Sequence, residues 1–505
     1  MSFSSYEFIL VFLPAAFLIT YLAHRIGGWD TAIPVLGVIS VLFYSFFGTV
    51  LVLVLILSVL INYQIGNMLI SMNGRKGSGY LLAFGIIGNL FALGYFKYTN
   101  FAIDIVNQFS GGEFSHLNIL LPVGVSFFTF IQTGYLIEAY GGQVKKPGLS
   151  KYLLFATFFP CVTAGPLVLQ KEIFEQLDNR KSRFIEPQRI IVGLTIFAIG
   201  LFKKVVIADS IAPYANTVFD RVADGQLVTM AAAWLGSLAY TIQLYFDFSG
   251  YSDMAIGIGL IFGLKLPLNF NSPLKATSIS DFWRRWHMTM TRFFTNYVFS
   301  PLAMNGMRRA LGDRYGHFRK YTVTAGGPVI VTFLVAGIWH GAGWTFVVYG
   351  LIHGFALAID HAWREFNGIK LPNFLGWALT MSVVVSGLVV FRAADLDVAT
   401  HILATMWGVA QLIPNTIDAS IAVYVEFDKR MAATFILLFG TIILAAPNSQ
   451  ELMRGIWKQD ELDRKEFEGM PIWKPSPMWS IATALVLLVG ITSMGDNSAF
   501  LYYQF

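Results

Sequence analysis

A charge-free stretch of 39 residues, from position 321 to 359, limits the possible folds more than any other feature of this sequence. A helix needs about 20 apolar residues to cross about 30 Å of hydrocarbon, so the stretch predicts two successive membrane-spanning helices. The sequence Gly-Ile-Trp-His-Gly-Ala-Gly occupies residues 337–343, in the middle of it. We therefore expect a membrane protein in which His340 lies at or near the turn between two helices.

His340 has two possible roles at such a turn. An imidazole within a membrane is costly, and intramembrane ionisable residues are candidates for function. The alternative is a histidine that binds a backbone carbonyl and holds the helices together. The flanking glycines allow close approach of the backbones, and Trp339 and Trp344 would supply rigid walls. We take the functional role as the working hypothesis.

The composition agrees with a membrane location. Of the 505 residues, 55% are hydrophobic and 13% are charged, whereas about 25% are charged in a typical soluble domain. We predict an all-α, polytopic integral membrane protein with roughly 11 to 12 transmembrane helices. No polar stretch is long enough for a soluble domain, so residues 1–505 are expected to form a single membrane domain.

The single cysteine, Cys161, excludes an intramolecular disulfide and a cysteine-based metal cluster. We expect no metal site, no bound cofactor and no nucleic-acid partner; membrane lipid is the expected surrounding.

The distribution of charge predicts the orientation. The other predicted spans are residues 8–22, 33–47, 50–70, 81–96, 120–139, 190–208, 230–246, 374–390, 432–446 and 478–492. Basic loops at 75–76 and 145–151 flank an acidic loop at 104–113. Because short cytoplasmic loops collect Lys and Arg, the N-terminus is predicted to lie outside. The segment 8–22 lacks a basic n-region and a cleavage site, so we expect it to stay as a membrane helix.

Two apolar segments do not fit a simple crossing. Pro160, Gly165 and Pro166 interrupt residues 153–168, and basic residues occur on both sides, which predicts a re-entrant loop. Residues 256–264 are too few to span a bilayer. The segment 265–320 contains ten Lys and Arg against two Asp, and its aromatic residues between 282 and 294 alternate with arginines. This pattern predicts a cytoplasmic segment with one helix in the membrane interface.

Two further motifs carry polar groups that could take part in chemistry. The first places Asp247, Ser249, Tyr251 and Asp253 at the predicted end of the span 230–246. They form either a binding site or a polar cluster that pins helices together. The second comprises Trp283, Arg284, Arg285, Trp286 and His287. It serves chemistry or contacts lipid phosphates. His353, also within the apolar stretch, is a secondary candidate.

These motifs together resemble the membrane-bound O-acyltransferase superfamily. The resemblance rests on residues 281–287, 336–341, 245–257 and 159–166, and it extends over nearly the whole chain. Within the superfamily, the chain is similar to the membrane subunits of bacterial alginate O-acetyltransferases. The resemblance implies an active site formed by His340 and His287. Cys161 departs from the polar residue or histidine expected there, which argues against a cysteine-bound acyl intermediate.

The resemblance also implies a reaction. An acetyl group would pass from a cytoplasmic acyl-thioester donor, with acetyl-CoA as co-substrate, to an exported polysaccharide such as alginate. A periplasmic acetyltransferase or esterase-like protein would be the partner, and the bacterial inner membrane the location. His340 would be the base, and His287 would orient the thioester or hydroxyl, or donate to the oxyanion.

Basic residues of the cytoplasmic segment, above all Arg284, Arg285, Arg308 and Arg309, are expected to attract the phosphates of coenzyme A. Because the donor is cytoplasmic and the acceptor lies outside, we also expect a bilayer-spanning passage, lined by the interrupted segments 153–168 and 256–264.

Two alternatives stay open at this stage. One is transfer of D-alanine from a carrier protein to teichoic acid, within the same superfamily. The other is a transporter or channel in which His340, Asp247 and Asp253 relay ions, because buried His and Asp occur in both classes of protein.

Overall fold

The computed structural model describes residues 1–178, 186–311, 316–366, 368–410, 425, 427–453, 473–495 and 500–501. All the secondary-structure elements of these residues are helices, which confirms the predicted all-α class. The chain divides into two compact units. The first comprises residues 1–201, 251–268 and 475–504, and the second comprises residues 202–250, 269–474 and 505. The expectation of a single membrane domain stays a prediction.

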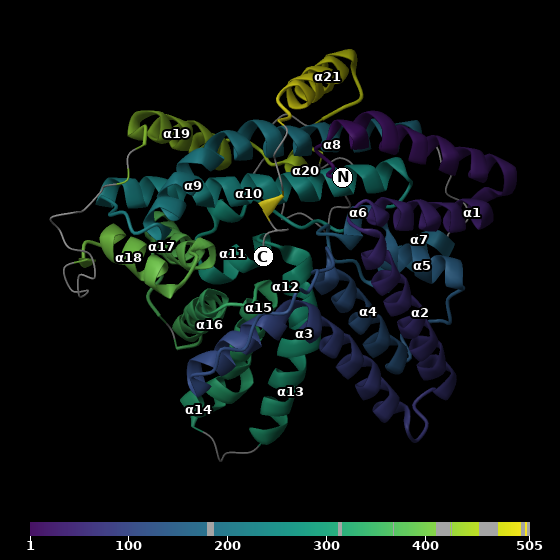
Figure 1. Cartoon of the computed structure of the whole chain (residues 1–505), viewed down its shortest axis with the longest axis horizontal. Helices are drawn as coiled ribbons and strands as arrows, with labels where there is room; N and C mark the ends of the chain where they lie inside the picture. The colour runs from purple at the N-terminus through teal and green to yellow at the C-terminus, as the bar shows by residue number, and fades with distance from the viewer. Residues whose placement is uncertain are drawn as a thin grey trace. The chain divides into compact units, whose positions relative to one another are not determined.

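The first unit contains most of the N-terminal helices (Figure 1). They are η1 (Glu7–Phe12), α1 (Leu13–Ser45), α2 (Thr49–Met72), α3 (Ser78–Ser110), α4 (Val125–Tyr140), α5 (Leu149–Thr157), α6 (Phe159–Val162), α7 (Gln170–Asp178) and α8 (Pro187–Phe202), with α21 (Pro477–Thr492). Both α2 and α3 pack against α4. The buried amides of Asn62 and Asn89 donate to each other across α2 and α3, at 3.0 and 2.7 Å.

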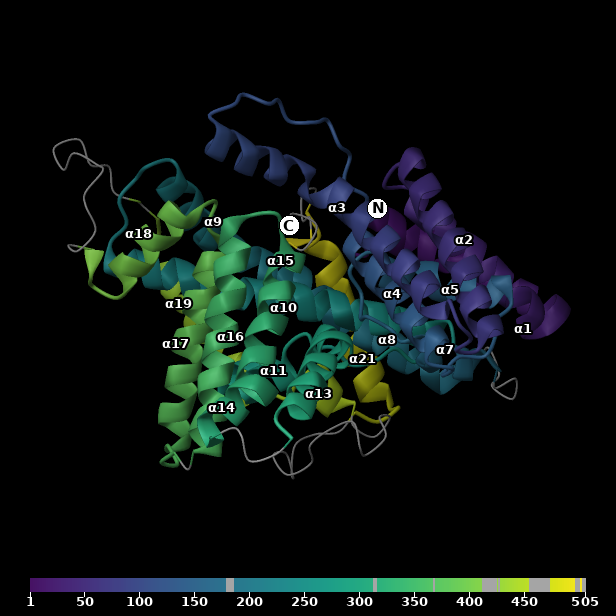
Figure 2. The ribbon, with the colours of Figure 1, turned by 90° about the horizontal axis from the view of Figure 1, so that it is seen from below.

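The second unit begins with the π-helical segment η2 and continues through α20. Its elements are η2 (Lys203–Ala208), α9 (Asp209–Ala223), η3 (Pro273–Lys275), α11 (Ile279–Arg285), α12 (Met288–Phe294), η4 (Thr295–Phe299), α13 (Ser300–Arg309), α14 (His317–Tyr321), η5 (Thr322–Gly326), α15 (Gly327–His340), α16 (Trp344–Glu365), α17 (Asn373–Arg392), α18 (Leu396–Met406), α19 (Lys429–Ala445) and α20 (Ser449–Leu452). Helices α16 and α17 run side by side, and α15 packs against α16 (Figure 2).

Within the described residues, seven helices are long and apolar enough to cross a membrane. They are Glu7–Ser45, Thr49–Met72, Ser78–Ser110, Pro187–Ala223, His317–His340, Trp344–Glu365 and Asn373–Arg392. The count is lower than the 11 to 12 spans expected from apolar segments. Helices α4, α19 and α21 have only 16, 17 and 16 residues, and the predicted span 230–246 is not among the seven. The predicted spans 8–22 and 33–47 also fall in one candidate, Glu7–Ser45, in which two helical segments meet at the non-helical Gly27 and Gly28. The predicted pair of spans that meets at His340 is confirmed by helical length.

Helix α10 (Met230–Ile261) corrects two expectations. The sequence predicts a helix end near residue 246 and a separate short segment at 256–264. Instead, α10 continues without a break for 32 residues and ends at Ile261. The glycines that suggested a break instead permit close packing. A Cβ atom on Gly257 would lie 2.5 Å from the carbonyl oxygen of Gly193, so glycine is required where α10 meets α8. Residues 256–261 are therefore helical and not irregular, and a place for this segment in the lining of a passage stays a prediction.

The expected interfacial helix across residues 282–294 is also wrong in one respect, because the structure has two short helices there. Helix α11 ends at Arg285, Trp286 is extended, and α12 begins at Met288. Residues 269–271 form hydrogen bonds with the backbone on both sides of the break: Asn271 N donates to Arg285 O, and Met288 N donates to Asn269 O, both at 2.9 Å. The predicted break in residues 153–168 is present, at Phe158 between α5 and α6; its re-entrant path stays a prediction.

Candidate active site

His340 is the last residue of α15, and the chain leaves the helix through Gly341, which is extended. Its side chain is buried among aromatic rings of the second unit. The ring centroids of Phe391, Tyr349 and Trp339 lie 5.2, 5.8 and 4.9 Å from that of the imidazole. Helices α16 and α17 thus supply two walls and α15 the third.

Glycines make this arrangement possible. A Cβ atom on Gly337 would lie 2.4 Å from Phe346 O, and one on Gly350 would lie 2.4 Å from Phe333 O. No side chain is compatible with those distances, so α15 and α16 approach through their backbones, as the sequence predicted. A Cβ atom on Gly341 would lie 2.0 Å from the Phe346 ring. The glycines hold His340 in a fixed position at the turn.

His287 occupies the break between α11 and α12, and its side chain is fully buried. Its backbone is left-handed, with φ 42° and ψ 52°, a conformation that is uncommon for a non-glycine residue and is often found at functional sites. The imidazole contacts Phe248 and Trp339, with ring centroids 4.7 and 6.3 Å away. Trp339 therefore contacts both histidines, and the structure brings the two predicted catalytic residues to one indole.

The hydrogen bonds of Asn269 establish the tautomer of His287. Asn269 Oδ1 lies 3.3 Å from the backbone N of Thr289, 2.9 Å from Thr289 Oγ1 and 3.0 Å from His287 Nδ1. A backbone N–H can only donate, so the Asn269 atom must be the carbonyl oxygen, which can only accept. His287 Nδ1 must therefore carry the hydrogen, and in the neutral ring Nε2 carries the lone pair.

Burial lowers the pKa of His287 to about 3, because the charged imidazolium would lose its hydration. His287 lies outside the seven candidate spans. At neutral pH the ring is uncharged, and with its hydrogen on Nδ1 it cannot donate from Nε2. Of the roles expected for His287, orienting a hydroxyl by accepting its hydrogen bond agrees with this geometry, whereas donation to an oxyanion does not.

Three other predicted residues, His353, Trp283 and Trp286, pack against aromatic rings of the second unit. His353 contacts Tyr349 and Trp283, with ring centroids 4.6 and 5.1 Å away, so Tyr349 contacts both His353 and His340. Within the described part of the chain, neither ring nitrogen of His353 has a hydrogen-bond partner. Its Nε2 atom packs against α17, since a Cβ atom on Gly387 would lie 2.6 Å from it. Trp286 stacks on Phe282 at 5.6 Å.

The paired arginines have different surroundings. Asp281 Oδ1 accepts from Arg284 at 3.3 Å and from Arg285 at 3.0 Å. The side chain of Arg284 is 72% exposed, whereas that of Arg285 is 15% exposed. Arg284 is thus available to an anionic ligand at the surface, and Arg285 belongs mainly to the fold of α11.

The polar motif of α10 is divided between the two units. In the second unit, Asp247 forms a buried ion pair with Lys204, whose Nζ lies 2.7 Å from Asp247 Oδ1 and 2.8 Å from Asp209 Oδ1. Ser249 is buried in the same unit. The side chains of Lys204 and Asp247 are 4% and 1% exposed. Asp247 therefore has a structural role, because it neutralises the buried charge of Lys204 in η2.

Tyr251 and Asp253 belong to the first unit and are buried there. The hydroxyls of Tyr251 and Thr163 are 2.6 Å apart. The Tyr251 ring stacks between Phe3 and Phe500, at centroid distances of 4.8 and 4.3 Å. Tyr251 thus joins the N-terminal segment, the 159–166 motif and the C-terminal region of this unit.

Sequence reasoning missed Asn269, Lys204 and Tyr349. Asn269 is a polar residue in an otherwise apolar run, Leu-Pro-Leu-Asn-Phe, 18 positions before His287, and this was the available signal. Among the described residues, no group of three or more His, Cys, Asp or Glu side chains could hold a metal ion.

We expect Cys161→Ser to keep at least half of the wild-type activity. Cys161 lies in the short helix α6 and is buried, and burial raises the pKa of its thiol, which disfavours the nucleophilic thiolate. Acyl transfer by the purified variant is the measurement. An inactive variant, together with an acyl group trapped on the wild-type thiol, would contradict this prediction.

Comparison with known proteins identifies the family of these motifs. A model described as MBOAT, membrane-bound O-acyltransferase family, matches residues 112–394. A peptidoglycan O-acetyltransferase from Helicobacter pylori is 34% identical over 100% of this chain and 97% of its own length. A probable alginate O-acetylase from Azotobacter vinelandii is 37% identical over 81% of this chain and 78% of its own. A teichoic acid D-alanyltransferase from Streptococcus thermophilus is 30% identical over 55% of this chain and 69% of its own.

Proposed function

This chain belongs to the membrane-bound O-acyltransferase family, and from that premise we propose that it moves an acetyl group from acetyl-CoA to a hydroxyl of an exported polysaccharide. The likeness to proteins named as O-acetyltransferases supports acetyl as the group, since it covers four fifths of the chain or more, whereas the likeness to a D-alanyltransferase covers 55%. The main observation in support of the proposal is that the rings of His287 and His340 both contact the indole of Trp339.

The two histidines have separate roles in the proposed reaction. The acceptor hydroxyl donates a hydrogen bond to His287 Nε2, which orients its oxygen toward the thioester carbonyl. The hydroxyl has one hydrogen, so as the oxygen attacks, this hydrogen leaves Nε2 of His287 and passes to His340 as a proton. The carbon–sulfur bond then breaks, and His340 gives the proton to the leaving thiolate. His287 is a poor base at neutral pH, because a ring with a pKa of about 3 holds a proton poorly there.

His287→Asn is expected to keep about tenfold more activity than His287→Ala, measured as kcat/KM for acetyl transfer. The amide oxygen of Asn can accept the hydrogen bond that orients the hydroxyl, and Asn tolerates the left-handed backbone at this position. His287→Gly is the backbone control, since glycine adopts φ 42° without strain. Equal losses in the Asn, Ala and Gly variants would contradict an orienting role and favour His287 as the base.

The proposal includes a direction across the membrane. We place the protein in the bacterial inner membrane with its N-terminus outside, which follows from the basic loops. Acetyl-CoA then reaches the site from the cytoplasm, and the acceptor reaches it from outside through a bilayer-spanning passage. A periplasmic polysaccharide-modifying protein is the proposed acceptor partner. The relatives' names include peptidoglycan and alginate as acceptor polymers, and either would be an exported polysaccharide.

Purified protein and labelled donors test this function. With radiolabelled acetyl-CoA we expect acetyl release or transfer, and with a D-alanyl carrier protein we expect none. Activity with the D-alanyl donor alone would support the D-alanyltransferase alternative. A transporter would instead give ion flux in liposomes that contain no acyl donor, together with no acetyl transfer.

A further inference from the structure

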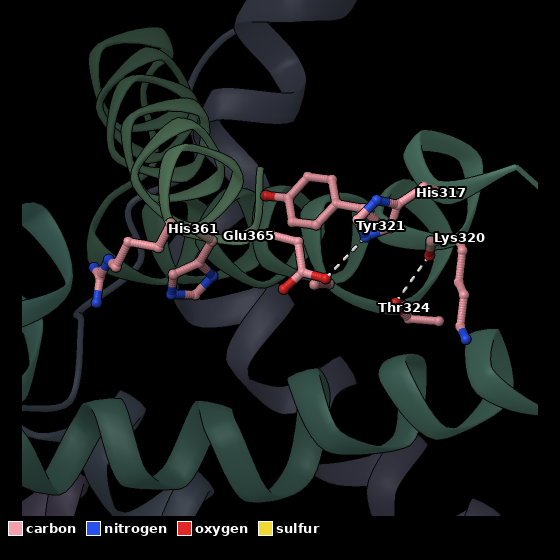
Figure 3. A pocket seen from close by; sticks show the side chains of 8 residues that line it. His317, Lys320, Tyr321, Thr324, His361 and Glu365 are labelled. Atoms are coloured by element: carbon pink, nitrogen blue, oxygen red, sulfur yellow. Dashed lines mark hydrogen bonds and ion pairs between the residues drawn. The ribbon is translucent and has the colours of Figure 1, made fainter. Parts of the chain in front are cut away.

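A cavity of about 480 Å³ lies in the second unit, far along the helices from the histidine pair. The start of the helix that runs from His317 to His340 and the end of α16 form its walls (Figure 3). Its lining residues are His317, Lys320, Tyr321, Thr324, Ala325, His361, Arg364 and Glu365. The volume is in the usual range for small-ligand sites, about 300 to 1,000 Å³.

The lining is rich in groups that bind phosphate. Lys320 and Arg364 carry fixed positive charge, and His317 and His361 present imidazole nitrogens. Glu365 is the one acid among the lining residues, and His317 Nε2 lies 3.1 Å from its Oε1. A dashed line marks this interaction in Figure 3. Arg364 forms an ion pair with Asp360: its Nε donates to Oδ1 at 3.2 Å and its Nη2 donates to Oδ2. The guanidinium has five N–H donors in all. Lysine and arginine beside one cavity are a typical phosphate-binding combination.

Further cations near the cavity add to the positive charge of its lining. Helix α13 packs on η5 so closely that a Cβ atom on Gly306 would lie 1.9 Å from Val323 O. This contact brings the exposed Arg308 and Arg309, which end α13, to the same part of the unit as Lys320. Among the residues that the structure describes here, the four cations Lys320, Arg364, Arg308 and Arg309 then outnumber the two acids, Asp360 and Glu365.

The cavity also lies where lipid headgroups are expected. Two candidate membrane spans have their ends at His317 and Glu365. Tyr321 and the half-exposed Trp363 lie within one or two turns of those ends, as aromatic residues do at the membrane interface. The same helix continues with Val331, Val335 and Ile338, which are 44%, 39% and 40% exposed and share one face by their spacing. That face is suited to contact with acyl chains.

We propose that this cavity binds the phosphate of an anionic phospholipid headgroup. Basic pockets at the ends of transmembrane helices recognise such headgroups. His340 is at the opposite end of the same pair of spans: 17 residues of α16 separate Trp344 from His361, about 26 Å at 1.5 Å per residue. The lipid site is therefore separate from the acyl-transfer site and does not rest on the roles proposed for the histidines.

Native mass spectrometry of the whole protein tests the proposal. The protein is released from nanodiscs of phosphatidylcholine that contain an equal share of phosphatidylglycerol. We expect wild type to retain phosphatidylglycerol over phosphatidylcholine, and Lys320→Glu to lower that preference at least fivefold, since each basic residue near a lipid surface contributes about that factor. Arg221→Glu is the matched control: it makes the same change of charge on an exposed arginine at the end of α9, outside the lining and outside α13, and its preference should stay within twofold of wild type.

A second arm separates a lipid headgroup from a soluble phosphate. Adding inorganic phosphate or coenzyme A at millimolar concentration should leave the retained lipid unchanged. Displacement of the lipid by either compound would overturn the proposal and identify a soluble phosphate ligand. Equal effects of Lys320→Glu and Arg221→Glu would also overturn it, because they would show general attraction to anionic membranes. His361→Gln, which leaves the fixed charge unchanged, should reduce the preference if the cavity itself is the site, and an unchanged preference would count against it.

Discussion

His340→Gln is expected to lower acetyl transfer by at least about a thousandfold while the protein remains folded. General base catalysis contributes about 10² to 10⁴ in rate, and the glutamine amide cannot take a proton. Glutamine also approximates the volume of the imidazole between Tyr349 and Phe391, so it limits the loss of packing. Initial rates with saturating donor, together with detergent-phase melting, separate loss of chemistry from loss of structure.

His340→Ala should be as inactive as His340→Gln but less stable, because it leaves a cavity among three aromatic rings. Donor binding should remain within a few-fold of wild type in both variants. More than a few per cent of residual activity in His340→Gln would show that another group is the base.

Lys204→Met is expected to destabilise the second unit strongly, by about 3 to 5 kcal/mol. Removing one partner of a buried ion pair leaves the other charge without compensation, and Asp247 is 1% exposed. Asp247→Leu should have a similar effect through the buried Lys204 ammonium, although Asp209 remains 2.8 Å from it. We expect both single variants to melt well below wild type.

The double variant Lys204→Met/Asp247→Leu should recover most of the lost stability, because an apolar pair of similar volume can replace a buried ion pair. It should also recover activity if Asp247 serves the fold alone. A double variant that melts like wild type and remains inactive would instead place Asp247 in substrate binding, as the sequence suggested.

Local features of the sequence predicted the turn at His340 correctly. The charge-free length and the glycines are properties of one continuous segment, and they required two helices that meet closely at residues 341–343. His287 was identified through the resemblance of its motif. Its tautomer could not be predicted, because it depends on Asn269, a residue brought to it by the fold.

The errors arose where partners are distant in the sequence. Gly257 in α10 suggested a break, but its missing side chain instead allows the backbone of Gly193 to pack closely against α10. The ion-pair partner of Asp247 is likewise distant, since Lys204 lies 43 positions earlier; a binding role for Asp247 stays a prediction. The helix break at Trp286 follows from backbone hydrogen bonds to residues 269–271. Periodicity and composition contain no information about such pairs.

Transfer across oriented proteoliposomes tests the central claim most directly. Radiolabelled acetyl-CoA is supplied only on the face that carries Lys320 and Arg364, which the positive-inside rule assigns to the cytoplasm, and a polysaccharide acceptor with its periplasmic partner protein only on the other. We predict label on the acceptor with wild type and none with His340→Gln. Label that appears only when donor and acceptor share one face, or that appears equally with His340→Gln, would contradict the account.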